Sequence, residues 1–424
     1  METFAGALKF VLPMFIILMI IELIVAKVKK KDVIKSMDAV SSLSSGLTNT
    51  LFKILGLTIY LVSYDFLLKH IVLFPIQSIA IQYIIGFLVL DFYVYWWHRW
   101  RHRYNILWNE HLIHHSSEEY NLPVALRQTT ADFFNPATFL FAPAAMFGIS
   151  LETLTILGVV MLFGGFWYHT KLIGKMGFLE YFLVTPSHHR IHHAINPIYI
   201  DKNFGGILII WDKIFGTFQE ELPDVKPVYG ITRPVNTWNP IKINFLHVSL
   251  LFKDAWRTTS VWDKFRIWFM PTGWRPSDVE QKFPVQSTKD PYNQVKYMPS
   301  SSIYLKIWAW SQLIITSILM MFLITQIAAI SKTALFVYSS FIFLSIYSYT
   351  ELMDKSRYAW MFEVARLVCA IIIIRVYGGW FTLDTFIPQG TTILLMYFSF
   401  SAAVSAAFDY FELKTTTPLL EVKA

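Results

Sequence analysis

Charged residues are scarce in this sequence. They make up 15% of the 424 residues, whereas Asp, Glu, Lys and Arg supply about a quarter of a typical soluble domain. Hydrophobic residues reach 55% and aromatic residues 17%, and the mean hydropathy is positive. This composition argues against a soluble globular enzyme and predicts one membrane-embedded body with modest segments outside the bilayer.

Cysteine is almost absent. The single Cys369 lies in an apolar run, so the chain has neither an internal disulfide framework nor a metal site built from cysteines. The net charge of +7 comes from basic residues beside apolar runs. Basic residues in such places indicate membrane-flanking charge rather than nucleic-acid binding.

The first long apolar run, Leu8 to Ala26, lacks the features of a cleaved signal peptide. No basic segment precedes it and no small-residue cleavage site is evident. Lys27 and three lysines at positions 29–31 follow it directly. We therefore expect a membrane anchor whose C-terminal end lies in the cytoplasm.

Two further runs, 51–68 and 76–97, predict a second and a third span. The third ends at Arg99, Arg101 and Arg103, which indicates a cytoplasmic exit on the same side as the first. The next runs, 133–149 and 154–167, are short and interrupted by Pro and Gly. They predict two tilted helices or a re-entrant hairpin, and either returns His169 to the side of the other histidines.

The rest of the chain divides into a polar part and a second membrane part. Residues 171–302 are mostly polar, and Trp256–Trp274 mixes aromatic and basic residues as interfacial segments do. Four apolar runs follow. They cover residues 307–330, 335–349, 362–376 and 392–408.

The predicted fold class is therefore an all-α, multi-pass membrane protein with a cytoplasmic cap. Four regions are expected. They are N-terminal transmembrane helices at 1–75, a catalytic region at 76–221, a cytoplasmic and interfacial segment at 222–302, and a C-terminal transmembrane unit at 303–412.

Ten of the twelve histidines cluster, and their spacing is helical. Residues at i, i+3 and i+4 share one face of an α-helix, so each box projects its imidazoles together. Besides His169 and His188, the clustered residues form three boxes. These are His98 and His102; His111, His114 and His115; and His189, His192 and His193.

Three converging boxes supply eight imidazoles, and His169 and His188 would bring the set to ten. That is too many for one ion but suits two ions with four or five nitrogens each. Structural zinc closes its shell with four ligands, whereas imidazole also suits iron. Oxidation of an unactivated C–H bond requires O2 activated by a redox metal, so a dinuclear redox site is the most economical interpretation. Paired iron matches the ligand number, and we expect the cytoplasmic cap to be a histidine-rich di-iron cap.

Other residues favour structural interpretations. His70 and His247 stand apart from the boxes and are expected to be hydrogen-bonded structural residues. Arg99 and Arg101 are expected to determine topology first, and the aromatic run 92–97 to form an interfacial belt.

The boxes and their surroundings resemble a known family. The matching stretches are HRWRH (98–102), HLIHHSSEEYN (111–121), ALRQT (125–129), FWYHT (166–170), TPSHHRIHH (185–193) and DKNFGGILIIWDKIFGTF (201–218). In this order they resemble the fatty acid hydroxylase and sterol desaturase superfamily of membrane di-iron enzymes, most closely its alkylglycerol monooxygenase branch. The resemblance covers about residues 91–221 closely and the rest more loosely.

The resemblance implies cleavage of glyceryl ether lipids to a fatty aldehyde and a glycerol derivative. It implies two iron ions and, as reductant, tetrahydrobiopterin. The branch carries Glu where this chain has Arg103, which weighs against pterin, and a separate electron donor is the alternative. No His-Pro-Gly-Gly haem motif is present, so a fused cytochrome b5 is not expected. The implied iron ligands are His98, His102, His111, His114, His115, His189, His192 and His193, with His169 and His188 as further candidates.

Residues near the boxes are candidates for orienting the ligands, because a metal-bound imidazole usually donates its second N–H to a carboxylate or carbonyl. We expect Asn121 and Arg127 also to line the lipid headgroup region. The candidates for the outer layer are Glu118, Glu119, Asn121, Asp201 and Asn203.

Two alternatives stay open. One is another reaction of the superfamily, such as sterol desaturation or hydroxylation of a fatty acid or sphingolipid. The other is a non-catalytic metal transporter, although transporters place ionisable residues near the bilayer midplane and these boxes lie at span ends. The expected partners are a bilayer lipid, O2 and a redox protein, with no nucleic acid. A bacterial plasma membrane and an endoplasmic reticulum membrane both fit.

Overall fold

The computed structural model describes the backbone from Glu2 to Lys414 and the side chains from Pro13 to Phe411 except Asp409. The N-terminal part of the expected anchor, Leu8 to Leu12, therefore lies outside the described side chains. The described chain is mostly helical and has one small sheet, in which β1 (Ile59–Tyr60) pairs in parallel with β2 (Phe134–Asn135). The prediction of an all-α fold is confirmed.

The chain forms two compact units. The first comprises Met1–Lys35, Gly56–Val235 and Ile243–Lys296, and the second comprises Ser36–Leu55, Asn236–Lys242 and Tyr297–Ala424. The division differs from the linear four-region scheme because a short N-terminal stretch joins the C-terminal helices.

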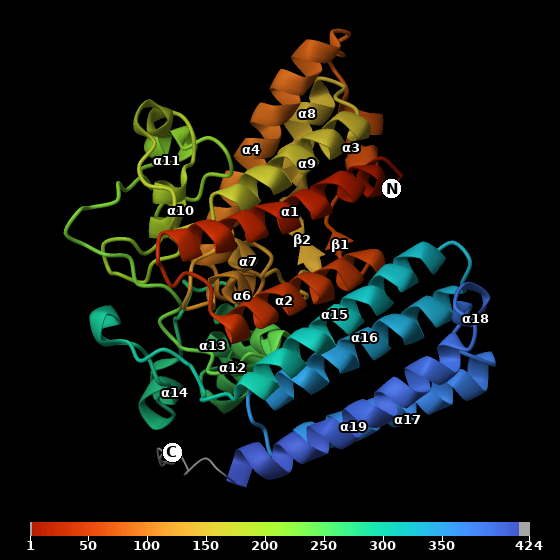
Figure 1. The fold of residues 1–424 in the computed structure, drawn as a ribbon. Coiled ribbons are helices and arrows are strands. Elements are labelled where there is room, and N and C mark those ends of the chain that lie inside the picture. The colour runs from red at the N-terminus through yellow and green to blue at the C-terminus, as the bar shows by residue number, and fades with distance from the viewer. Residues whose placement is uncertain (1, 415–424) are drawn as a thin grey trace. The chain divides into compact units, whose positions relative to one another are not determined.

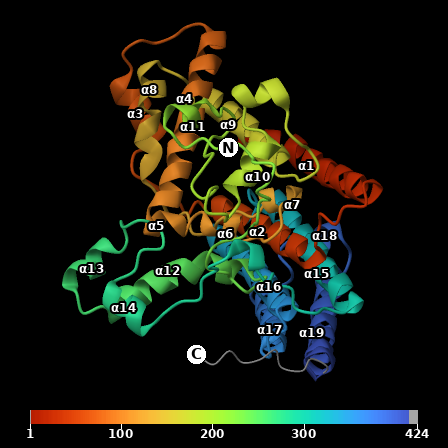
Figure 2. The same cartoon turned by 90° about the vertical axis from the view of Figure 1, so that its left-hand side faces the viewer.

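Three long helices form the apolar part of the first unit: α1 (Glu2–Val28), α4 (Ile79–Arg103) and α9 (Leu151–Trp167). Helix α9 packs against both others (Figures 1 and 2). The Phe15 ring stacks on Phe166 with centroids 3.8 Å apart. Gly86 lets α4 approach α9, since a Cβ there would lie 2.9 Å from Leu157 Cδ1.

The run from 51 to 68 does not form one span, so that prediction was wrong. Helix α2 (Ser36–Ile54) ends just before Gly56, which has a φ of +63°, a conformation that glycine adopts without strain. Strand β1 follows, and α3 (Tyr64–Ile71) begins at Ser63, whose side chain accepts a hydrogen bond from the Phe66 N–H.

The run from 133 to 167 forms short apolar helices. They are η1 (Pro136–Phe141), α8 (Ala142–Met146) and α9. The N-cap of α9 is Ser150, which accepts a hydrogen bond from the Thr153 N–H.

Short helices and loops make up the rest of the first unit. They are α5 (Asn105–Trp108), α6 (Leu112–His115), α7 (Leu122–Ala125), η2 (Gly177–Tyr181), α10 (Pro186–His192), α11 (Ile210–Ile214), α13 (Val261–Arg266), α14 (Ser277–Lys282) and η3 (Pro291–Asn293). Helix α12 (Pro240–Arg257) contributes most of its length to this unit.

The second unit is a bundle of helices. Helix α2 packs against α15 (Ile303–Gln326) and α16 (Lys332–Met353), and α17 (Ala359–Tyr377) packs against α16 and α19 (Gly390–Lys414). The short α18 (Leu383–Phe386) lies between α17 and α19 in the sequence. Buried residues such as Val40, Leu51 and Ile342 join α2 to the core of this unit.

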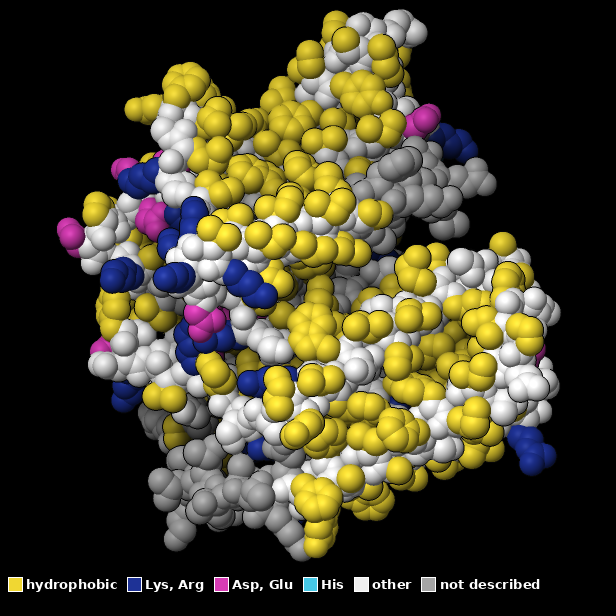
Figure 3. All heavy atoms as spheres, in the orientation of Figure 1, with side chains coloured by type: hydrophobic (Ala, Val, Ile, Leu, Met, Phe, Trp, Pro, Cys, Tyr) yellow, Lys and Arg dark blue, Asp and Glu magenta, His cyan; other side chains and the backbone are white. Residues whose placement is uncertain are grey.

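Within the described chain, four helices are long and apolar enough to cross a bilayer: α4, α15, α16 and α19. Large apolar side chains also face outward elsewhere. Along α1, for example, Ile16, Ile17 and Ile20 are about half exposed, and Figure 3 shows hydrophobic side chains over this helix. Such surfaces match lipid rather than water, and the chain is an integral membrane protein.

A buried ion pair lies inside the second unit. Arg366 Nη2 and Glu363 Oε2 on α17 lie 2.6 Å apart, and each side chain is 1% exposed. Arg366 also donates to Gln312 of α15 and to Ser401 of α19. Since ionised groups in a membrane interior are costly unless paired, these bonds explain how three apolar helices accommodate two charges.

We predict that Arg366→Ala destabilises the second unit by about 3–5 kcal/mol, because it leaves the Glu363 carboxylate buried without its cation. Thermal unfolding of the purified protein in detergent measures this change. The matched control is Arg357→Ala at an exposed site, which is expected to leave the unfolding midpoint unchanged. Equal midpoints for both variants would contradict the assignment.

Candidate metal centre

Nine buried or half-buried imidazoles converge in the first unit, and they form two groups. Within each group, one nitrogen of every residue lies within 4.8 Å of those of the others. The first histidine group consists of His98, His102, His111, His115 and His192, and the second of His114, His169, His189 and His193.

The Nε2 atoms face one another in both groups. In the first group the Nε2 atoms of His98 and His111 lie 2.8 Å apart, and His115 Nε2 lies 3.2 Å from His102 Nε2 and 3.1 Å from His192 Nε2. All these nitrogens therefore point toward a common space.

Two short helices each supply both groups. On α6, the neighbours His114 and His115 diverge, one to each group, and on α10, His192 enters the first group while His189 enters the second. The groups are consequently adjacent, and the rings of His115 and His193 stack across them with centroids 4.3 Å apart. The expectation that each box projects all its imidazoles together was therefore wrong for two boxes: residues at i and i+4 stay in one group, whereas His114 and His192 each enter the other group.

Helix α4 contributes two histidines to the groups, and the segment after α9 contributes one. His98 and His102 lie one turn apart near the end of α4, and His169 follows the C-terminal end of α9. Helix α10 starts at Thr185, whose hydroxyl accepts a hydrogen bond from the His188 N–H, with Pro186 in its first turn. Both features are typical of a helix N-terminus.

Burial keeps seven of these imidazoles neutral. It lowers the pKa of His114 to about 4, and it lowers the pKa values of His111, His115, His169, His189, His192 and His193 well below the usual range. A neutral imidazole has one nitrogen with a free lone pair, which is the form that binds metals.

The second group contains a triangle that hydrogen bonds cannot satisfy. The Nε2 atoms of His169, His189 and His193 lie 3.0, 3.0 and 3.2 Å apart. Each neutral nitrogen is either a donor or an acceptor, so among three mutual neighbours at least one pair must be mismatched. Ligands at right angles on an ion with bonds of about 2.1 Å lie about 3.0 Å apart, so a cation resolves the mismatch and the residues fit a metal.

One loop orients three imidazole rings of the first group. The Nδ1 atoms of His98 and His192 lie 2.8 Å from the Phe204 and Lys202 carbonyl oxygens, and His102 Nδ1 lies 3.3 Å from Asp201 Oδ1. These contacts hold the rings with Nε2 inward.

Two buried carboxylates anchor that loop. Asp212 accepts hydrogen bonds from the Phe204 and Gly205 N–H groups, both at 2.7 Å. Asp91 of α4 accepts from the Ile207 N–H and the Trp211 Nε1–H. Sequence reasoning missed both residues, although an acidic residue inside the apolar run of α4 was a usable signal.

Comparison with known proteins identifies the family. Residues 83–217, which contain all nine histidines, match the family model described as Fatty acid hydroxylase. Alkylglycerol monooxygenase from Homo sapiens is 36% identical over 371 residues, covering 86% of this chain and 81% of that protein. Those from Xenopus tropicalis and Danio rerio are each 31% identical, covering 85% and 86% of this chain and 80% and 81% of theirs.

The chain belongs to the alkylglycerol monooxygenase family. No solved structure matches it. Membership in this family makes the chain an oxygen-using monooxygenase, and the transporter alternative is set aside.

The candidates for the outer layer occupy different places. Asp201 contacts His102, whereas Asn203 donates to the His188 carbonyl and so holds the loop behind the histidine groups. Glu119 pairs with Lys171 at 3.1 Å and Lys296 at 2.6 Å. Glu118 and Asn121 were the other candidates for the outer layer, and Arg127 was expected with Asn121 to line the lipid headgroup region. Glu118 accepts a hydrogen bond from Gln294, Asn121 donates to the Val33 carbonyl, and the Arg127 carbonyl lies 3.1 Å from His114 Nδ1.

Three other histidines lie outside both groups. His188 lies with Nδ1 3.2 Å from the Leu183 carbonyl and its ring against Phe218, so its nitrogens do not join the convergence. The other two have backbone partners as expected of structural residues. His70 Nδ1 lies 2.8 Å from the Phe66 carbonyl, and His247 Nε2 lies 3.0 Å from the Asn105 carbonyl.

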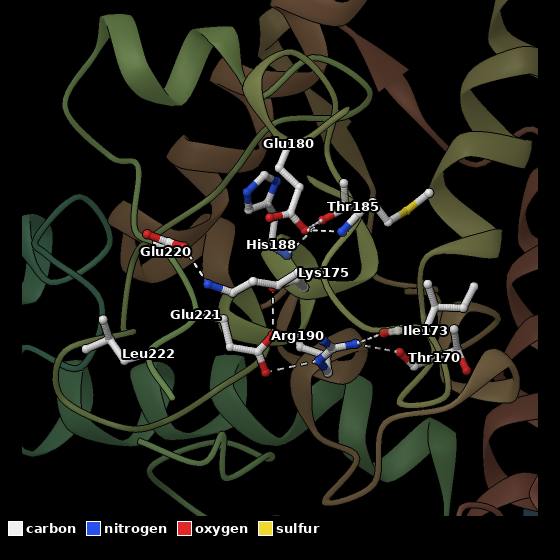
Figure 4. Close-up of polar contacts among 12 residues, drawn as sticks. Thr170, Ile173, Lys175, Glu180, Thr185, His188, Arg190, Glu220, Glu221 and Leu222 are labelled. Carbon is white, nitrogen blue, oxygen red and sulfur yellow. Dashed lines mark hydrogen bonds and ion pairs between the residues drawn. The ribbon is translucent and has the colours of Figure 1, made fainter. Parts of the chain in front are cut away.

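Arg190 fastens α10 to the segment after His169. Figure 4 shows its guanidinium between the Glu221 carboxylate, at 2.7 Å, and the carbonyls of Thr170 and Ile173, at 3.1 and 2.6 Å. The same segment is held from α1, where Glu22 accepts a hydrogen bond from the Thr170 hydroxyl at 2.6 Å. Glu22 was another residue that sequence reasoning missed.

We predict that Asp212→Asn lowers the metal affinity of the first histidine group about 10–100-fold, because the loop that orients His98 loses an acceptor. The second group does not use this loop and is expected to keep its affinity. Competition with a chelator, followed by metal analysis, measures both. Asp224→Asn at an exposed position is the matched control, and equal metal loss in both variants would contradict the loop's role.

Proposed function

We propose that this protein is a monooxygenase that cleaves glyceryl ether lipids. It would insert one oxygen atom of O2 into the C–H bond of the alkyl carbon next to the ether oxygen, while the other oxygen atom leaves as water with two electrons and two protons from a reductant. The hemiacetal then breaks its C–O bond to give a fatty aldehyde and a free glycerol hydroxyl.

The pairing of the two histidine groups carries this proposal. Nine imidazoles in two adjacent groups, to which α6 and α10 both contribute, suit two metal ions side by side, and neither group includes a cysteine or a carboxylate. We infer iron, because imidazole suits it and because bound iron would supply the O2 activation that side chains cannot. The ligands would be the nine residues of the two groups.

The surrounding residues orient the histidine rings and cover the second group. The carbonyls of Phe204, Lys202 and Arg127 fix the orientation of ligand rings. The Tyr120 ring stacks on His169 and on Tyr229, and its hydroxyl donates to the Tyr168 carbonyl. These packed rings cover the buried second group, which would limit side reactions of the O2 chemistry that bound iron would supply.

The proposed reaction also needs a reductant. Tetrahydrobiopterin is expected from the resemblance, and a separate electron-donor protein is the alternative. Arg103 has a basic side chain where the resembling branch has an acidic one, so the external donor is the form that this sequence favours.

We infer that the histidine groups face the cytoplasm. Lys27 lies in the last turn of α1, lysines follow it at positions 29–31, and Arg101 and Arg103 lie in the last turn of α4. The C-terminal ends of both helices therefore follow the positive-inside pattern. The alkyl chain of the substrate would then enter from the bilayer, with its headgroup at the cytoplasmic surface.

A second candidate is hydroxylation of another lipid, which the match to the fatty acid hydroxylase model favours. Product analysis separates the two. Ether cleavage releases an aldehyde, whereas simple hydroxylation leaves the lipid intact with one added oxygen.

We predict that the purified protein, loaded with iron and given O2 and a pterin or a chemical reductant, releases fatty aldehyde from an alkylglycerol. Losing one ligand is at least as damaging as losing an orienting partner, so His192→Ala and His189→Ala should lower aldehyde formation by at least about 100-fold. His70→Ala, outside both groups, should retain activity. A hydroxylated, uncleaved lipid would favour the second candidate, and full activity of His192→Ala would overturn the metal assignment.

A further inference from the structure

A pocket opens beside the first histidine group. It has a volume of about 200 Å³ and is lined by Arg99, His102, Arg103, Asp201, Phe204 and Thr217. Because His102 is a member of the first histidine group, whatever occupies the pocket lies next to the proposed metal centre.

The pocket is positively charged. Arg99 and Arg103 are four residues apart on α4 and so share one face of the helix. Neither guanidinium has an ion-pair partner among the described side chains. Arg101, between them, differs because it pairs with Glu110 at 3.4 Å and Asp132 at 3.7 Å.

Neighbouring side chains hold one of the two cations in place. Arg99 Nη1 donates to the Tyr95 hydroxyl at 3.0 Å, and the guanidinium lies over the Trp96 ring. The pocket's single carboxylate, Asp201, is directed to His102 Nδ1. Two guanidinium groups and one carboxylate give the lining a net positive charge, and the buried Asp212, which accepts a hydrogen bond from Thr217, lies behind the lining within electrostatic range of Arg99.

The size limits the ligand. Sites for whole drug-sized molecules usually measure about 300–1,000 Å³, so this pocket suits a headgroup or a small anion. Guanidinium groups are the preferred protein donors to phosphate, since their N–H groups can match its oxygens in pairs.

We propose that this pocket binds a phosphate group through Arg99 and Arg103. The phosphate could come from the headgroup of a lipid or from a soluble phosphate ester. Since α4 is a candidate membrane span and both arginines lie in its last two turns, the pocket is within reach of lipid headgroups. A role for this pocket in substrate binding rests on the proposed function. Phosphate binding itself can be measured without any turnover.

The test is calorimetric titration of the full-length protein in detergent with glycerol 3-phosphate and, separately, with glycerol. We expect glycerol 3-phosphate to bind, more weakly at high salt, and glycerol not to bind. Arg103→Gln should weaken binding at least about tenfold, because it removes a charge-assisted contact. Arg103→Lys should retain part of the affinity, and Arg357→Gln, an exposed arginine of the second unit, should leave it unchanged.

A second arm identifies the source of the phosphate. Tighter binding of an alkylglycerol phosphate in micelles than of glycerol 3-phosphate would support a lipid headgroup, and equal binding would support a soluble phosphate ester. Absence of binding by both probes, or binding that is the same in wild type, Arg103→Gln and Arg103→Glu, would overturn the proposal.

Aldehyde release from a neutral alkylglycerol, measured on the same preparations, separates this inference from the proposed function. Phosphate binding that depends on Arg103, without aldehyde from any ether lipid, would refute the function and leave the pocket. Aldehyde release without phosphate binding would refute the pocket and leave the function.

Discussion

The convergence of imidazole nitrogens is the constraint on which the rest of the first unit depends. Three mutually close Nε2 atoms in the second group cannot all be satisfied by hydrogen bonds. Burial makes protonation unfavourable, so a bound cation is the remaining way to stabilise the arrangement. The short helices α6 and α10 hold the two groups next to each other, because each helix contributes histidines to both groups.

The surrounding structure then serves to keep the rings in place. The backbone carbonyls that accept from His98 and His192 belong to a loop with unusual geometry, in which Asp201 and Asn203 have φ values of +56° and +57°. Strain of this kind persists where neighbours fix it. Here Asp212 and Asp91 fix the loop, and Arg190 fixes the segment that carries His169.

The convergence of the box histidines was predictable because helical spacing brings residues at i and i+4 to one face. His169 was predictable only from topology, since it depends on the chain returning across the apolar part. The division of neighbours such as His114 and His115 between the groups was not predictable, because it depends on the three-dimensional approach of α10. For the same reason the sequence did not indicate that α2 packs with the C-terminal helices. It also did not indicate that the helix in the second apolar run would stop just before Gly56.

Metal stoichiometry tests the central claim most directly. Iron analysis of the reconstituted protein, together with Mössbauer spectroscopy to count distinct sites, should give two irons per chain in two nitrogen-rich environments. His98→Ala should affect the first site more strongly, and His169→Ala the second. One iron per chain, or a single zinc that neither substitution removes, would contradict the account.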